Sequence, residues 1–150
     1  MRSRIDLAIL MPFALTLMAA GNTKQATIED TGSTNVAGAI LVVNAGGSTK
    51  VQPHGAEAHT ISLDPHLCDK FFEDLKSAAP LSQLPHAHCM KSISFGSSLY
   101  VEFNGERSPD LNCPAPRDSK LGVLQKDVRE IMQAAHLQMG GSRSQGGFRK

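Results

Sequence analysis

Histidine and cysteine side chains gather in one short segment, His86-Ala87-His88-Cys89-Met90. In an extended chain, alternate side chains point to the same side, so the imidazoles of His86 and His88 would lie together. Imidazoles combined with a thiolate or thioether are ligands that suit zinc or copper. The segment is therefore a candidate metal site through His86 and His88, which would need further ligands from elsewhere in the chain. Two solvated histidines in a loop are the simpler interpretation.

A single carboxylate stands in a motif associated with acid–base chemistry. Residues 30–33 read Asp-Thr-Gly-Ser, which resembles the short motif of aspartic proteases, where two aspartates share a proton. A chain of this length would need a symmetric dimer to supply the second carboxylate. Glu29 stands where those proteases have an apolar residue, and the nearest counterpart of their late apolar-apolar-Gly segment, around Gly122, lies in a helical pattern. A polar turn beginning at Asp30 is the structural alternative.

Two of the three cysteines flank a predicted β-hairpin. Residues 99–103 alternate apolar and polar side chains, as a strand with one buried face does. Asn104-Gly105 is typical of a two-residue type I′ turn, after which residues 106–108 would return as a short strand. A Cys89–Cys113 disulfide would close a loop of about 25 residues and stabilise the fold by about 3–4 kcal/mol. Two buried free thiols are the alternative.

The first twenty residues have the organisation of a secretory signal peptide. Arg2 and Arg4 precede an apolar run over residues 7–20, which ends in the small residues that signal peptidase requires. The run is short for a membrane span, so no stable span is expected after cleavage near Ala20 or Gly21. Export to the periplasm or the extracellular medium would place the cysteines where disulfides form. An uncleaved anchor is the alternative.

The charge balance argues against polyanionic partners. Removal of residues 1–20 takes away Arg2, Arg4 and Asp6, which changes the formal charge from +1 to zero. Binding to nucleic acid or to an anionic membrane depends on excess positive charge. The chain also has no tryptophan and one tyrosine, which leaves few rings on which bases could stack.

The pattern of the remaining chain predicts two hairpins and two helices. Residues 39–44 form a β-branched run that predicts a buried strand, residues 49–52 can return beside it, and residues 60–63 can add a further strand. Residues 21–34 are interpreted as a polar leader. Residues 140–150 are basic and glycine-rich, so we expect a disordered tail.

Both helices carry an apolar stripe that can cover a sheet. The first begins at Asp64-Pro65, where Asp64 can cap free N–H groups, and ends at Pro80. Cys68 falls on the apolar face of this helix, so we expect a buried side chain rather than a reactive nucleophile. The second begins at residues 118–119 and ends at residues 140–141. The prediction is one α+β domain over residues 35–139, with two layers. An antiparallel sheet of four to five strands packs against the two amphipathic helices.

Three separated segments resemble a group of small exported bacterial proteins of unassigned function. They read Ile-Glu-Asp-Thr-Gly-Ser-Thr-Asn at residues 28–35, His-Cys-Met-Lys-Ser-x-Ser-Phe-Gly-Ser-Ser at 88–98, and Ser-Pro-Asp-Leu-x-Cys-Pro at 108–114. The resemblance covers about residues 28–137. It implies export and one compact domain, and it carries no catalytic residues to transfer.

The sequence favours a non-enzymatic, exported domain that binds a protein partner in the cell envelope. A disulfide-framed hairpin would present Tyr100, Glu102, Asn104 and Arg107 at little ordering cost, in the manner of a protease inhibitor. No cofactor is expected. The second hypothesis is a periplasmic zinc or copper binder, and the third is a dimeric aspartic-type protease that uses Asp30. The oligomeric state stays open among these.

Overall fold

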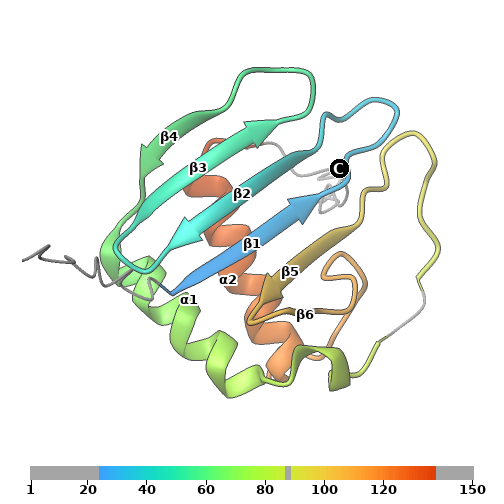
Figure 1. The fold of residues 1–150 in the computed structure, drawn as a ribbon. Helices are drawn as coiled ribbons and strands as arrows, with labels where there is room; N and C mark the ends of the chain where they lie inside the picture. The colour runs from blue at the N-terminus through green and yellow to red at the C-terminus, as the bar shows by residue number, and fades with distance from the viewer. Residues whose placement is uncertain (1–23, 87–88, 138–150) are drawn as a thin grey trace, which may run out of the picture.

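Six strands and two helices make up the fold in a computed structural model, which describes residues 24–86 and 89–137 (Figure 1). The predicted signal peptide and C-terminal tail lie outside these residues, as does His88. In chain order the elements are β1 (Gln25–Asp30), β2 (Ala39–Asn44), β3 (Ser48–Pro53), β4 (His59–Ser62), α1 (Pro65–Ala78), a 3₁₀ turn (Leu81–Gln83), β5 (Leu99–Phe103), β6 (Glu106–Arg107) and α2 (Lys120–Ala134).

The strands form one antiparallel sheet in the order β4-β3-β2-β1-β5-β6. Both predicted hairpins are present, one formed by β2 and β3 and the other by β5 and β6. Asn104 and Gly105 adopt φ values of 53° and 79°, as a type I′ turn requires. The α+β prediction is confirmed, with one strand more than the four to five expected.

The additional strand is β1, so the prediction of a polar leader over residues 21–34 is wrong for residues 25–30. β1 lies near the centre of the sheet and pairs with β2 on one side and β5 on the other. Its side chains do alternate, with Ala26, Ile28 and Asp30 buried. Only Ile28 among these is a large hydrophobe, and an aspartate occupies the third core-facing position. Residues 25–30 therefore alternate as a strand does, but they lack the large apolar residues that usually occupy the buried positions.

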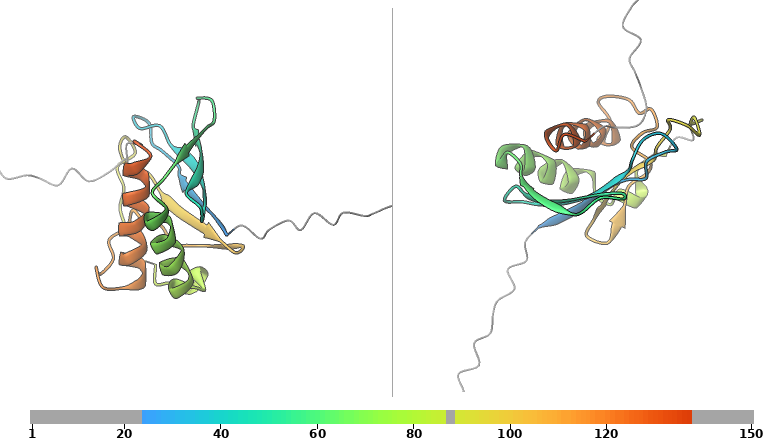
Figure 2. Two further views of the ribbon diagram at one scale, coloured as in Figure 1. Left: turned by 90° about the vertical axis from the view of Figure 1, so that its left-hand side faces the viewer. Right: turned by 90° about the horizontal axis from the view of Figure 1, so that it is seen from above.

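Both helices cover the same face of the sheet (Figure 2). Their apolar stripes and the inward side chains of the strands form one core, which includes Leu41, Phe71, Leu75, Val101, Leu124 and Ile131. Cys68 is a buried free thiol within this core, and burial raises its pKa. The opposite face of the sheet is not covered by any described helix (Figures 1 and 2).

The predicted helix starts are confirmed by their caps. The Asp64 side chain accepts a hydrogen bond from His66 N, and Ser119 Oγ accepts one from Gly122 N at 3.0 Å. α2 ends at Ala134, earlier than the predicted stop at residues 140–141. His136 adopts a left-handed φ of 56° and ends the helix in the manner usually associated with glycine. No helix within residues 24–86 and 89–137 is long and apolar enough to cross a membrane.

Candidate functional site

Three loop segments that are distant in sequence meet at one end of the sheet. They are the β1–β2 loop (residues 31–38), the loop of residues 89–98, and residues 108–114 after β6 (Figure 1). Each of these segments overlaps one of the three sequence patterns at residues 28–35, 88–98 and 108–114. Their polar residues therefore have a common structural role, which is to hold the 89–98 loop in place.

A disulfide and an ion pair fasten the 89–98 loop to residues 108–114. Cys89 and Cys113 are bonded, as predicted, with their Cα atoms 5.5 Å apart. Lys91 Nζ donates to Asp110 Oδ2, to Ser97 O at 2.7 Å and to Ser98 Oγ at 3.0 Å. Burial alone would raise the pKa of Asp110, but Lys91 and two backbone N–H groups outweigh it and lower the pKa. Asp110 therefore stays ionised near neutral pH, and its ion pair with Lys91 persists there.

The β1–β2 loop fastens the other side of the 89–98 loop by hydrogen bonds. Ser33 Oγ donates to Ser94 O at 3.0 Å, and Thr34 Oγ1 donates to Ile93 O at 3.3 Å. Thr31 N donates to Ser98 O, and Ser98 N donates back to Thr31 Oγ1, both at 2.9 Å. The 89–98 loop is therefore bonded on both flanks.

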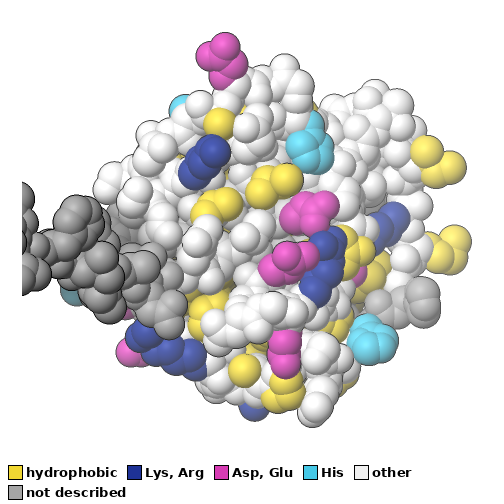
Figure 3. All heavy atoms as spheres, in the orientation of Figure 1, with side chains coloured by type: hydrophobic (Ala, Val, Ile, Leu, Met, Phe, Trp, Pro, Cys, Tyr) yellow, Lys and Arg dark blue, Asp and Glu magenta, His cyan; other side chains and the backbone are white. Residues whose placement is uncertain are grey.

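This anchored loop exposes three large apolar side chains. Met90 is fully exposed, Ile93 is 89% exposed and Phe95 is 57% exposed. Within the described part of the chain, these are the only large hydrophobic side chains with high exposure. Hydrophobic side chains project at the right-hand edge of the space-filling view (Figure 3). We call Met90, Ile93 and Phe95 the apolar loop patch; a patch on an ordered loop indicates an interaction site.

A recess and a groove lie beside the apolar loop patch. The recess has a volume of about 400 Å³, and Met90, Phe95 and Arg129 contribute to its lining. Arg129 also lines the neighbouring groove along α2, which has a volume of about 1130 Å³ and includes Arg117. Neither arginine forms an ion pair with a carboxylate of the described residues. The recess and groove therefore offer positive charge next to apolar surface.

The charged side chains of the predicted binding hairpin form ion pairs with one another and with Glu29. Arg107 forms ion pairs with Glu29 at 2.8 Å and with Glu102 at 2.7 Å. Its guanidinium also lies 4.0 Å from the centroid of the Tyr100 ring, a cation–π distance. Asn104 is exposed at the turn. Arg107 is paired with two carboxylates and lies over Tyr100, so the charged side chains of this hairpin already have partners on the uncovered face of the sheet.

The candidate metal site is incomplete in the described residues. The Nδ1 atom of His86 lies 3.2 Å from Leu84 O, and Cys89 is in the disulfide. No group of three His, Cys, Asp or Glu side chains within residues 24–86 and 89–137 is placed to hold a metal ion. With His88 outside these residues, the metal hypothesis stays a prediction.

Asp30 forms the polar turn that was the structural alternative to a protease motif. Its Oδ1 atom accepts a hydrogen bond from Gly32 N at 2.9 Å. Gly32 has a φ of 67°, and a Cβ added there would lie 2.4 Å from Gly38 N. A Cβ added at Gly38 would lie 2.2 Å from Asp30 O, so both glycines are needed for the two backbone segments to pack together.

A second buried carboxylate, Asp127, joins the two helices. Lys70 of α1 bonds to Asp127 of α2 and, at 3.0 Å, to Asp74 of its own helix. Burial raises the pKa of Asp127 to about 6; the Asp74 carboxyl adds to the rise and Lys70 opposes it. Such a carboxyl could act as an acid near neutral pH, but it is fully buried and out of reach of a substrate. The trio therefore ties α1 to α2.

Comparison of the chain with protein-family models, curated proteins and solved structures returns no match. The site must therefore be interpreted from its own residues. The sequence predictions missed the apolar loop patch and Arg129. The available signal was three large apolar residues at irregular spacing in a Ser- and Gly-rich stretch, where no strand or helix could bury them together.

Proposed function

We propose that this chain is an exported binding domain that engages a protein partner through the apolar loop patch. The observation that carries the proposal is the exposure of Met90, Ile93 and Phe95 on a loop that is anchored on both flanks. Exposure of three large apolar side chains to water is unfavourable unless a partner covers them in the bound state. The predicted signal peptide and the disulfide support the exported compartment.

The anchoring of the loop is what makes binding efficient. A free loop would lose conformational entropy on association, at about 0.5–1.5 kcal/mol for each immobilised side chain. The disulfide and the Lys91–Asp110 ion pair order the loop when the protein folds, so less entropy is lost when the partner binds. Inhibitor loops work on the same physical basis, so an inhibitor-like role is one form of the proposal.

The neighbouring arginines specify the chemistry of the partner. Arg117 and Arg129 line the groove beside the patch without a carboxylate partner in the described residues. A partner that supplies acidic side chains next to aromatic or aliphatic ones would satisfy both features. A protein segment suits the recess of about 400 Å³ better than a bilayer does, because a recess accepts individual side chains. We therefore propose an acidic, apolar protein segment as the partner.

Peptide display against the exported, oxidised protein tests this proposal. Selected peptides should combine aromatic or aliphatic residues with Asp or Glu, and should bind with micromolar affinity. The triple variant Met90→Ser/Ile93→Ser/Phe95→Ser should bind them at least ten times more weakly, because the apolar contacts are lost. Arg129→Glu should weaken binding about tenfold, which corresponds to about 1.4 kcal/mol.

The matched control is Ile40→Ser, which removes a half-buried apolar side chain from the uncovered face of the sheet. It should leave peptide affinity unchanged. Equal affinity of the peptides for the wild type and the triple variant would contradict the proposal. So would binding of the wild type to phosphatidylglycerol vesicles, or its self-association in sedimentation, if either depended on the patch and no peptide were selected.

A further inference from the structure

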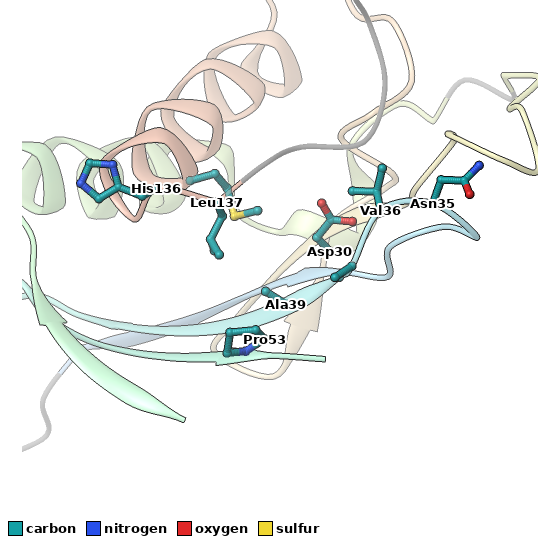
Figure 4. Close-up of a pocket in the computed structure, with 10 residues that line it drawn as sticks. Asp30, Asn35, Val36, Ala39, Pro53, His136 and Leu137 are labelled. Atoms are coloured by element: carbon teal, nitrogen blue, oxygen red, sulfur yellow. The ribbon is translucent and has the colours of Figure 1, made fainter. Parts of the chain in front are cut away.

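A small pocket with a buried carboxylate lies between the sheet and the C-terminal end of α2. It has a volume of about 250 Å³, roughly that of eight water molecules in the liquid. The β1–β2 loop, β3 and the end of α2 contribute to its wall. Figure 4 shows the Asp30 side chain pointing from the end of β1 into this space. The pocket is on the helix-covered side of the sheet, apart from the proposed partner surface.

The Asp30 carboxylate has one oxygen without a donor. The side chain is 1% exposed, because Asp30 occupies a core-facing position of β1. Its Oδ1 atom accepts the Gly32 N–H, whereas Oδ2 has no hydrogen-bond partner among the described residues. A buried carboxyl oxygen without a hydrogen-bond partner is costly, and native proteins rarely leave one unsatisfied. This atom therefore indicates that something supplies a donor from within the pocket.

Among the described residues that line the pocket, none carries a permanent positive charge beside Asp30. Asn35 and His136 are its other polar side chains, and Val36, Pro53 and Leu137 are apolar. No lysine or arginine of residues 24–86 and 89–137 lines it. No second carboxylate of the described part of the chain lines it either, so these residues form no proton-sharing pair of the aspartic-protease type. The pocket thus combines one negative charge with an apolar wall.

We propose that this pocket binds the cationic head of a small primary amine, with Asp30 as its counter-ion. An ammonium group supplies the donor that Oδ2 lacks and a permanent positive charge beside the carboxyl group. The apolar wall would contact a short alkyl portion of the same ligand. The close backbone packing at Gly32 and Gly38 holds the carboxylate in position before the ligand arrives. Binding, rather than catalysis, is the role that these residues support.

Titration with n-butylammonium chloride, followed by backbone amide chemical shifts, tests the proposal. The wild type should show saturable shifts for residues 30–38 and for residues at the end of α2, with a dissociation constant on the order of 1–10 mM. n-Butanol has the same alkyl chain without the charge and should bind at least ten times more weakly. Equal shifts from the two probes, or shifts that never saturate, would overturn the proposal and leave only water as the donor.

Two variants separate the role of the charge from that of the fold. Asp30→Asn keeps the side-chain shape and an acceptor for Gly32 N–H, and it should bind butylammonium at least ten times more weakly. Val36→Trp leaves the carboxylate in place but fills the pocket, and it should also lose binding. His66→Ala removes an exposed imidazole of α1 outside the pocket; it is the matched control and should stay within threefold of the wild type. Unchanged affinity in folded Asp30→Asn would contradict the assignment.

Discussion

At the scale of single residues, the two buried aspartates show where sequence patterns and chemistry disagree. Asp30 occupies the third core-facing position of β1, and Asp127 stands in the apolar stripe formed by Leu124, Val128 and Ile131. In each case the position is that of a hydrophobe and the residue is a carboxylate. A charge on the apolar face of a predicted element was therefore the signal that could have found both residues.

Asp127 gives a pH dependence whose direction follows from its raised pKa. Its ordinary pKa is 3.8 and the folded value is about 6, so the folded state binds more protons than the unfolded state between these pH values. The stability from the protonated carboxyl is therefore fully present below about pH 4 and is lost as the pH rises through 6. The loss could reach about 3 kcal/mol for a shift of two pKa units.

The comparison of the wild type with Asp127→Asn isolates this effect, because asparagine does not titrate. Urea unfolding at pH 4.5 and 7.5 should show that the wild type loses stability relative to the variant as the pH rises. The pKa of Asp74 is lowered, because Asp127 and Lys70 outweigh the effect of burial, so Asp74 is ionised at both pH values in the wild type. Lys70 still lowers the pKa of Asp74 in the variant. Unfolding free energies that run parallel for the two proteins would refute the account.

At the scale of elements, the sequence predicted what local rules determine. The helix starts followed from Asp64 and Ser119, and the β5–β6 turn followed from Asn104-Gly105. β1 was missed because it is held by β2 and β5 on its two sides, which depend on contacts distant in sequence. The anchoring of the 89–98 loop could not be predicted beyond its disulfide, because its hydrogen bonds come from the β1–β2 loop.

The disulfide should stabilise both the fold and the 89–98 loop. The Cys89→Ser/Cys113→Ser variant should lose about 3 kcal/mol of unfolding free energy, the amount expected for a loop of this length. Amide hydrogen exchange should quicken most in residues 89–98, since one of their two anchored flanks is released. Cys68→Ser is the control for the loss of a thiol, and it should not change exchange in that loop. Unchanged loop exchange in the double variant would show that the hydrogen bonds alone hold the loop.

At the scale of the whole molecule, the fold separates its surfaces by role. The two helices cover one face of the sheet (Figure 2). The uncovered face carries the ion-paired cluster of Arg107 with Glu29 and Glu102. The loops at one end carry the apolar loop patch beside Arg129. The balance of exposed apolar area and unpaired charge therefore favours the loop end, rather than the β5–β6 hairpin, as the surface for a partner.

The most direct test of the central claim is to map a selected acidic, apolar peptide onto the oxidised protein by amide chemical shifts. The account predicts that the largest shifts fall on residues 89–98 and around Arg129. It also predicts that Tyr100 and Arg107 stay within the background. Shifts centred on Tyr100 and Arg107, with the 89–98 loop unchanged, would contradict the account. They would indicate that the partner binds the β5–β6 hairpin.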